Sequence, residues 1–249
     1  MNIPSLVAAI IFFISAISVF ADDIPSNAGV VTYVKGVAQK KGTAGEEWER
    51  AKENTNLASG DKIKTLEKTR AEIRLEAGTV IRLDENTTVD LVKLVEESQG
   101  KVETDIKMEQ GNLWAKVGKL GEKTEFKVES PIAGASIRGT TFRVEVALGG
   151  STQLNVYEGA VEVYNPMQRA NGPVTRIEAP REVAKPGYVE GPKEVTLQEW
   201  SYIVRNMQKF TINQAGVKKI ESFKKNDMDE QSDWVRWNMM RDREMEKKK

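Results

Sequence analysis

Apolar and polar residues alternate along much of the chain between positions 24 and 163. The alternation is cleanest in residues 101–108, where Val102, Thr104, Ile106 and Met108 fall on one face and four charged residues on the other. A period of two residues predicts an antiparallel strand with one buried side and one side in water. The same period recurs in Ala71/Ile73/Leu75, Phe126/Val128, Phe142/Val144/Val146, Leu154/Val156 and Val161/Val163.

Glycine residues fall where these predicted strands must reverse. They occur in the pairs Ala77-Gly78, Gln110-Gly111, Gly149-Gly150 and Glu158-Gly159. Glycine accepts the positive φ angle that hairpin turns require. About ten short strands with no helical pattern between them are typical of two packed sheets rather than of alternating strands and helices. The sequence therefore predicts a mainly β fold, an antiparallel β-sandwich or roll, over residues 22–165, with a C-terminal helical appendage.

The character of the sequence changes after this region. Residues 166–194 contain Pro166, Pro173, Pro180, Pro186 and Pro192, which is too many for a helix or a central strand. We expect one or two closing strands here and then a linker. Ile177 and Val183 are candidates for pairing at a sheet edge, with Pro186-Gly187 as the turn.

Residues 195–249 are predicted to be helical. Thr196 and Glu199 match a capping box, and the apolar residues after them recur at three- and four-residue steps. That stripe consists of Leu197, Trp200, Ile203, Val204 and Met207. A second helical stretch is predicted around Val217, Ile220 and Phe223, and a third from about Asp229. The charged residues from Arg241 onward are expected to fray.

The N-terminus carries an apolar run from Leu6 to Phe20. The end of this run and the next residue, Val19-Phe20-Ala21, form a cleavage signal. This pattern predicts a signal peptide over residues 1–21, removed after Ala21. The run is shorter than the roughly 20 residues of a membrane span, which favours removal over an uncleaved anchor. No later segment is apolar enough to cross a bilayer, so we expect a periplasmic protein without a stable membrane span after signal removal.

Composition excludes several classes of function. The 249 residues include no cysteine and no histidine, and the 37 basic residues balance the 37 acidic ones. The lack of cysteine rules out disulfides and a lipidated cysteine, which fits a bacterial periplasm. The lack of histidine removes serine–histidine triads and the common zinc sites. A net charge of zero gives no indication of nucleic-acid binding. We therefore expect no enzyme activity, no cofactor and no metal site.

Several short motifs between Val30 and Val163 occur in a characteristic order. They are Gly36-Val37-Ala38, Trp48, residues 57–65, residues 71–83, Gly111-Asn112-Leu113-Trp114, residues 138–144 and residues 156–163. In this order and spacing the sequence resembles FecR-like domains. The resemblance implies a β-rich, non-catalytic periplasmic module. In the transmembrane regulator that names the family, this module relays the occupancy of an outer-membrane receptor to a sigma factor. A signal peptide is expected here in place of that regulator's cytoplasmic anti-sigma segment, so direct sigma-factor control is not expected.

The motif residues themselves are expected to be structural. They are Gly60, Asp61, Gly78, Arg138, Gly139, Thr140, Phe142 and Gly159. Residues 134–141 have the glycine spacing of a phosphate loop, but Thr140 replaces the required lysine and a strand follows. Arg138 is expected to bond nearby carbonyls or a buried acid rather than a ligand carboxylate. Asp61 is expected to cap a turn rather than to bind a metal.

The acidic cluster of Asp227, Asp229, Glu230 and Asp233 is interpreted as a helix N-terminus, not as a calcium loop. Trp234, Trp237 and Met240 are candidate partner-binding residues, since tryptophan and methionine are enriched at protein interfaces. The alternative, that the indole rings of Trp234 and Trp237 pack against the β domain as ordinary core, stays open. For Trp200 the core position is favoured.

These observations predict a non-catalytic periplasmic protein that acts in protein–protein binding or assembly. Its partner is expected to be another envelope or periplasmic protein, such as a filament or a receptor. One alternative is a structural component of a periplasmic assembly, such as periplasmic flagella. Another is a sensory relay from an outer-membrane receptor. A glycan-cleaving hydrolase is disfavoured, because the acidic residues alternate onto predicted solvent faces.

Overall fold

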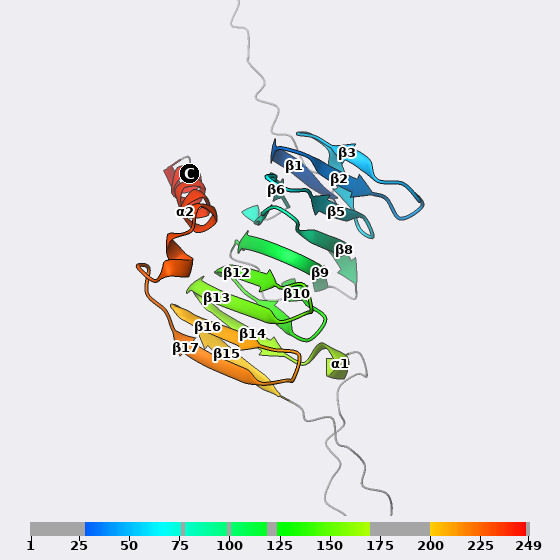
Figure 1. Cartoon of the computed structure of the whole chain (residues 1–249). Coiled ribbons are helices and arrows are strands. Elements are labelled where there is room, and N and C mark those ends of the chain that lie inside the picture. Colours follow the sequence, from blue (N-terminus) through cyan, green and yellow to red (C-terminus); the bar gives the residue numbers. More distant parts are fainter. Residues whose placement is uncertain (1–27, 76–77, 99–100, 119–123, 170–199, 248–249) are drawn as a thin grey trace, which may run out of the picture.

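The structure is a computed structural model, which describes residues 28–75, 78–98, 101–118, 124–169 and 200–247 (Figure 1). The first strands are β1 (Ala28–Lys35), β2 (Ala38–Lys41), β3 (Glu49–Ala51), β4 (Asn56–Ala58), β5 (Lys62–Thr65), β6 (Arg70–Arg74), β7 (Val80–Leu83) and β8 (Thr88–Ser98). They are followed by β9 (Lys101–Lys116), β10 (Thr124–Glu129), β11 (Gly134–Ile137), β12 (Thr141–Val146), β13 (Thr152–Glu158) and β14 (Ala160–Tyr164). The last elements are α1 (Pro166–Arg169), β15 (Ser201–Arg205), β16 (Gln208–Ile212), β17 (Lys218–Ser222), the 3-10 helix η2 (Met228–Gln231) and α2 (Asp233–Lys247).

The strands form two sheets that share one long strand. Sheet A has the order β4-β1-β6-β7-β9-β12-β13-β16-β17. Sheet B has the order β3-β2-β5-β8-β9-β10-β11-β14-β15. All of these pairs are antiparallel except β9 and β10, which run parallel. The prediction of a mainly β fold, an antiparallel β-sandwich or roll with a C-terminal helical appendage, is therefore confirmed, and the sheets do not close.

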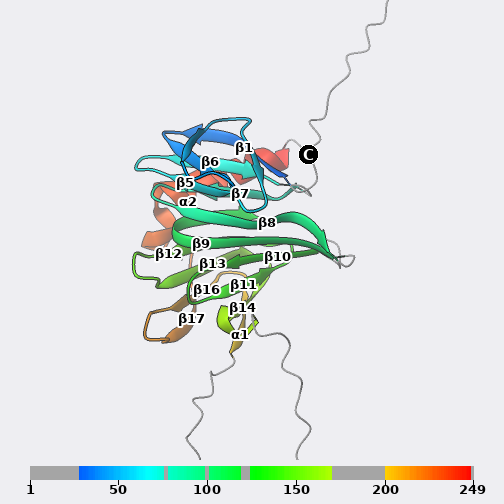
Figure 2. The same cartoon turned by 90° about the vertical axis from the view of Figure 1, so that its right-hand side faces the viewer.

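Strand β9 connects the two sheets through a bend at Gly111. Residues up to Gln110 pair with β8 in sheet B, whereas Gly111 and the residues after it pair with β12 in sheet A. Gly111 has a φ of 103°, which side chains other than glycine rarely allow. Figure 2 shows β8 and β9 crossing the middle of the molecule as long neighbouring strands. The bend lets one strand belong to both layers of the sandwich.

The hydrophobic core lies between the inner faces of the two sheets. The alternation seen in the sequence explains it, because every second residue of a strand points to the same side. Ile73, Leu113 and Phe142 in sheet A and Ile106 and Val163 in sheet B are almost completely buried in one continuous cluster. Within the described ranges, no helix has both the length and the apolar character that crossing a bilayer requires.

The helical prediction for the C-terminal segment was wrong for residues 201–222. These residues form β15, β16 and β17, which extend the open edges of the two sheets beyond β14 and β13. Hydrogen bonding to a free sheet edge outweighed the local three- and four-residue spacing, which is a weak preference. The predicted helix from about Asp229 is confirmed as η2 and α2. Arg241 to Lys247, expected to fray, are helical instead.

Some predictions fall outside the described residues. They are the signal peptide over residues 1–21, the capping box at Thr196 and Glu199, and the edge pairing of Ile177 and Val183.

The bend at Gly111 gives a stability prediction. A Cβ atom at Gly111 would overlap with Thr87, whereas a Cβ at Gly150, also at positive φ, meets no atom within 4 Å. We expect Gly111→Ala to lower the free energy of unfolding by at least about 2 kcal/mol, and Gly150→Ala by about 1 kcal/mol. Urea unfolding followed by tryptophan fluorescence measures both. Equal losses in the two variants would show that the bend is not constrained by Thr87.

Candidate functional site

A row of large and polar side chains crosses the outer face of sheet A. Strand register places Glu72 opposite Arg82, Arg82 opposite Trp114, Trp114 opposite Arg143, and Arg143 opposite Asn155. Residues that are opposite one another on neighbouring strands point to the same face of a sheet. We call these five residues the outer row. None of them is more than 4% exposed, although they lie on the side away from the core.

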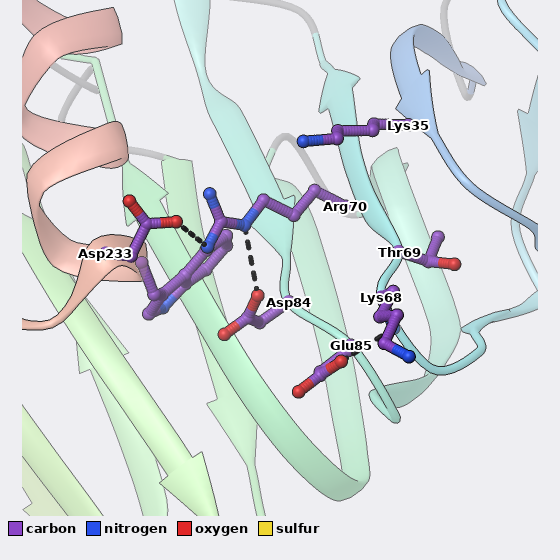
Figure 3. Close-up of a pocket in the computed structure, with 8 residues that line it drawn as sticks. Lys35, Lys68, Thr69, Arg70, Asp84, Glu85 and Asp233 are labelled. Carbon is purple, nitrogen blue, oxygen red and sulfur yellow. Dashed lines mark hydrogen bonds and ion pairs between the residues drawn. The ribbon is translucent and has the colours of Figure 1, made fainter.

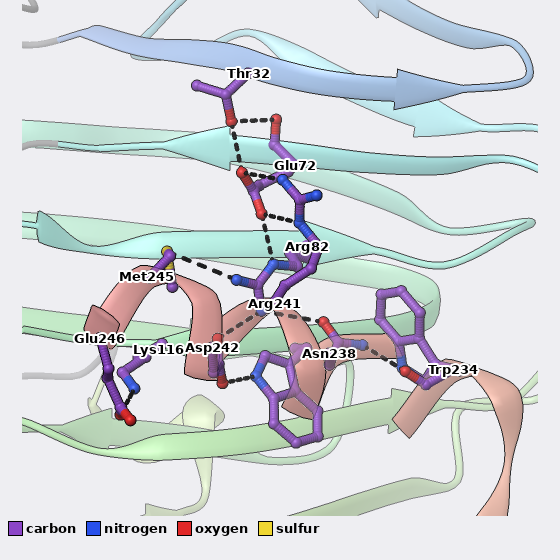
Figure 4. Close-up of polar contacts among 11 residues, drawn as sticks. Thr32, Glu72, Arg82, Lys116, Trp234, Asn238, Arg241, Asp242, Met245 and Glu246 are labelled. Carbon is purple, nitrogen blue, oxygen red and sulfur yellow. Dashed lines mark hydrogen bonds and ion pairs between the residues drawn. The ribbon is translucent and has the colours of Figure 1, made fainter. Parts of the chain in front are cut away.

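The 3-10 helix η2 and helix α2 cover the outer row. In Figure 1, α2 stands beside the strands of sheet A, and Figure 4 shows its side chains meeting those of β6, β7 and β9. The buried residues of α2 are Trp234, Val235, Asn238 and Asp242, which share one helix face. The helix therefore buries as many polar as apolar side chains against the sheet.

Arg82 lies at the centre of this contact and has no exposed side-chain surface. Its Nε donates to Glu72 Oε2 over 2.7 Å, and its Nη1 donates to Asp242 Oδ1 over 2.7 Å and to Asn238 Oδ1 over 3.3 Å. The second oxygen of Asp242 accepts a hydrogen bond of 3.0 Å from Trp114 Nε1. Asp242 on α2 thus holds two neighbours of the outer row at the same time.

Glu72 is surrounded by donors on its other sides. Arg241 on α2 donates from Nε over 2.8 Å and from Nη2 over 3.1 Å, and Thr32 Oγ1 donates over 2.9 Å. Burial by itself raises the pKa of Glu72, but the hydrogen bonds and charges of Arg241 and Arg82 outweigh it and lower the pKa to about 2. Glu72 is therefore ionised at every physiological pH and bound to two guanidinium groups.

The far end of the outer row is held by η2. Glu230 is 2% exposed, and its Oε1 accepts from Asn155 Nδ2 over 2.8 Å and from Arg143 Nη2 over 3.3 Å. Tyr157 stacks on Trp114 with ring centroids 4.4 Å apart, and burial raises the pKa of its hydroxyl. The acidic residues Asp229, Glu230 and Asp233 lie in the first turns of η2 and α2, as the interpretation as a helix N-terminus expects, and Glu230 in addition binds the outer row. Because Glu72, Glu230 and Asp242 are buried, the expectation that the acidic residues lie on solvent faces was wrong for these three.

A cleft of about 520 Å³ opens at the N-terminal end of α2 (Figure 3). It is lined by Lys35, Lys68, Thr69, Arg70, Asp84, Glu85, Asp233 and Trp234. Arg70 crosses it, with Nε 3.3 Å from Asp84 Oδ1 and Nη2 3.0 Å from Asp233 Oδ2. Its guanidinium also lies over the Trp234 ring, 5.5 Å from the ring centroid. The cleft therefore holds matched charges, and its central cation already binds α2.

The candidate partner-binding residues lie at different depths. Trp234 is 4% exposed and packs in one cluster with Trp114 and Val235. Trp237 is partly buried, stacks on Trp234 with centroids 5.5 Å apart, and lies near Tyr33. Met240 is 52% exposed on the side of α2 away from the sheet. Trp200 packs against the core beside Phe210. The chain's own sheet thus contacts both indole rings of α2.

The motif residues occupy turns and core positions. Asp61 Oδ2 accepts a hydrogen bond of 2.8 Å from Ala58 N, across the turn between β4 and β5, and pairs with Lys40. Phe142 is completely buried, and Thr140 Oγ1 donates to Arg138 O over 3.0 Å. The Arg138 side chain is exposed, and the expected bond to a carbonyl or an acid is not found among the described residues. The four motif glycines, Gly60, Gly78, Gly139 and Gly159, all have positive φ.

The residues that build this site were not singled out in the sequence. A signal was nevertheless present: Arg82 interrupts the apolar segment Val80–Leu83, and the symmetry of the 71–83 hairpin places position 72 opposite position 82. Among the described residues, no group of three acidic side chains is arranged to hold a metal ion. The chemistry of the site is charge pairing between a sheet and a helix.

The fold and the site define an open two-sheet β-sandwich whose C-terminal helix is held on one sheet by buried ion pairs. Residues 61–162 of the chain match the family model described as FecR protein. The resemblance seen in the sequence is therefore confirmed. The matched residues include the whole outer row, whereas η2 and α2 lie beyond them.

Solved structures give a more distant likeness. Two crystal structures described as a "putative anti-sigma factor" from Parabacteroides distasonis are each 16% identical to this chain, with TM-scores of 0.45 and 0.44. Each match covers 65% of this chain and 59% of that chain, so the likeness extends over less than two thirds of that protein. No curated protein matches the sequence.

The pKa of Glu72 predicts how stability depends on pH. A carboxylate with a pKa of about 2 in the folded state and 4.5 otherwise stabilises the fold above pH 4.5. This contribution, about 3 kcal/mol, is lost as the pH falls from about 4.5 through about 2. We expect Glu72→Gln to be less stable at pH 7 and to lose less stability on acidification, as measured by urea unfolding at pH 7, 4 and 2.5.

The matched control is Glu67→Gln, because the Glu67 side chain is exposed and pairs with the exposed Lys68. This control should follow the wild-type pH profile. Identical acid profiles for the wild type and Glu72→Gln would show that Glu72 does not hold the helix through its charge.

Proposed function

We propose that the protein is an exported, non-catalytic FecR-domain protein that binds another envelope protein in the periplasm and serves as a regulatory relay. The observation that carries this proposal is the buried ion-pair contact between the outer row and α2. FecR domains are known as relay modules, and the match over residues 61–162 supports that role for this chain. The apolar run at residues 6–20 and the lack of cysteine support export to the periplasm.

The arrangement of charges supports binding rather than chemistry. A catalytic acid, base or nucleophile must reach a reacting group in a space that a substrate can occupy. The charged groups of the outer row instead contact partners from the same chain: Arg82 contacts Glu72 and Asp242, and Arg143 contacts Glu230. Their arrangement positions two parts of the chain relative to each other.

A relay needs an element with two arrangements whose balance a partner can change. Helix α2 has the properties of such an element. It is 15 residues long, a length at which an isolated helix is marginal in water, so it depends on the sheet for its structure. Half of its buried side chains are polar, and the cost of desolvating buried ion pairs offsets much of their attraction. The ion pairs thus fix the position of α2 on the sheet, but the net free energy with which they hold it there is small.

Edge strands favour the assembly role as a second candidate. Strand β15 lies at the edge of sheet B, and its residues Tyr202 and Ile203 are 39% and 47% exposed. An open strand edge with exposed apolar side chains is a site where another chain can add a strand. Co-purification with filament proteins would favour this role, whereas co-purification with a receptor or a transmembrane regulator would favour the relay.

The relay makes a prediction about hydrogen exchange. We expect the backbone amides of α2 to exchange faster than those of β7 and β9, because the helix can open without unfolding the sandwich. Lys116 Nζ and Glu246 Oε1 are 2.6 Å apart, and the chain has no cysteine of its own. Joining Lys116→Cys to Glu246→Cys with a short bis-maleimide should therefore slow exchange in α2 only.

The control for that experiment is the same double variant with both thiols capped separately. If the amides of α2 are protected as strongly as those of β9, the helix opens only when the whole protein unfolds. The relay mechanism then fails.

Capture in cells tests the partner. We expect the protein in the periplasmic fraction, and we expect it to retain an envelope protein after affinity purification. Because the relay works through movement of α2, the cross-linked double variant should retain this partner to a different extent from the capped control. Quantitative mass spectrometry measures the difference. Recovery in the cytosolic fraction, or turnover of glycan or peptide by the purified protein, would contradict the proposal.

A further inference from the structure

We propose that α2 can be exchanged between copies of this chain, so that the outer row of one copy binds the α2 helix of a second copy. This inference rests on the proposed function, because exchange requires α2 to leave its own sheet. It identifies the outer row as an interaction surface and a second copy of the chain as its partner.

The chemistry of the outer row defines which helix it can bind. Across β6, β7 and β9 the row presents a carboxylate, a guanidinium and an indole N–H, from Glu72, Arg82 and Trp114. A matching helix must bring a guanidinium to the first group and a carboxylate that accepts from the other two. Arg241 and Asp242 of α2 do this through hydrogen bonds of 2.7 to 3.1 Å.

A mismatched helix would be strongly disfavoured. Without the Asp242 carboxylate, Arg82 would lose its 2.7 Å partner on the helix side and Trp114 Nε1 would lose its acceptor. Burying such groups without partners costs several kcal/mol. The helix that demonstrably satisfies the outer row is α2 of this sequence, and a second copy supplies the same helix with the same contacts.

The connection between β17 and α2 permits exchange. Phe223 is buried and anchors the start of this connection against Tyr157, with ring centroids 5.5 Å apart. Residues 224–229 are exposed, and Met228 is 90% exposed. Residues 224–227 can span up to about 14 Å when extended, so that η2 can move together with α2. Among the described residues no strand follows α2, so its departure leaves the strand order of both sheets unchanged.

Exchange replaces each contact by an identical one. The exchanged dimer and the closed monomer therefore differ mainly in the entropy of association and in the strain of the connection. The fraction of exchanged dimer rises with protein concentration, whereas the formation of the contact within one chain does not depend on concentration. This difference makes exchange measurable.

The test mixes two full-length single-cysteine variants, Lys116→Cys and Glu246→Cys, and treats the mixture with the short bis-maleimide. Exchange places the two thiols of different copies at the ion-pair position that joins Lys116 and Glu246 within one chain. We expect a covalent dimer whose yield rises with protein concentration, detected by denaturing gel and intact mass. Adding Asp242→Ala to the Glu246→Cys chain should speed the approach to this yield without changing its equilibrium value, because the variant helix lacks the same hydrogen-bond partner in the closed and in the exchanged state.

The matched control replaces Glu246→Cys by Leu148→Cys, since Leu148 is 87% exposed on a hairpin far from α2 in the sequence. This mixture reports random collision. If the Glu246→Cys mixture gives no more dimer than this control, while the double variant Lys116→Cys/Glu246→Cys cross-links within one chain, exchange is refuted and the relay proposal stands. If the double variant does not cross-link internally either, the docked helix and the relay proposal fail together with the exchange.

Discussion

The structure depends on the burial of one guanidinium, that of Arg82. A charge without contact to water must be paired, and losing one partner of such a pair typically costs about 3 to 5 kcal/mol. Glu72 on the neighbouring strand and Asp242 on α2 supply the two partners of Arg82, one from within the sheet and one from the helix. The helix therefore completes the charge balance of the outer row, and its position follows from that need together with the packing of Trp234 and Val235 against the sheet.

Strand β9 gives this contact its place in the fold. Its bend at Gly111 takes the strand from sheet B into sheet A, and Trp114 follows three residues later on the outer face. One side of sheet A then packs on the core, and the other presents the outer row to η2 and α2. An open antiparallel sheet normally leaves such a face to water. Here the helix covers it. The polar groups of the covered face make the contact specific, but the cost of desolvating them keeps its net free energy small.

Much of the fold could be predicted from the sequence, and little of the site. Two-residue alternation identified inward residues such as Phe142 and Ile106, and glycine marked turns such as the one at Gly159. The same alternation predicted that Glu72 lies on the solvent-exposed face of its strand. Periodicity separates the two faces of a strand, but it does not show whether another element covers the outer face. The strand β15 was missed for a related reason, since the spacing of Ile203 and Val204 fits both a helix stripe and an edge strand.

The sequence by itself determined that the chain forms short alternating strands, that its turns need glycine, and that its motifs resemble those of FecR-like domains. These properties are local, because they depend on neighbouring residues and on motif order. Only the tertiary structure decided that residues 201–222 complete the two sheets and that α2 pairs with the outer row. These contacts join residues as far apart as Glu72 and Arg241, and a charged side chain becomes a partner only when folding brings its counter-charge within hydrogen-bonding distance.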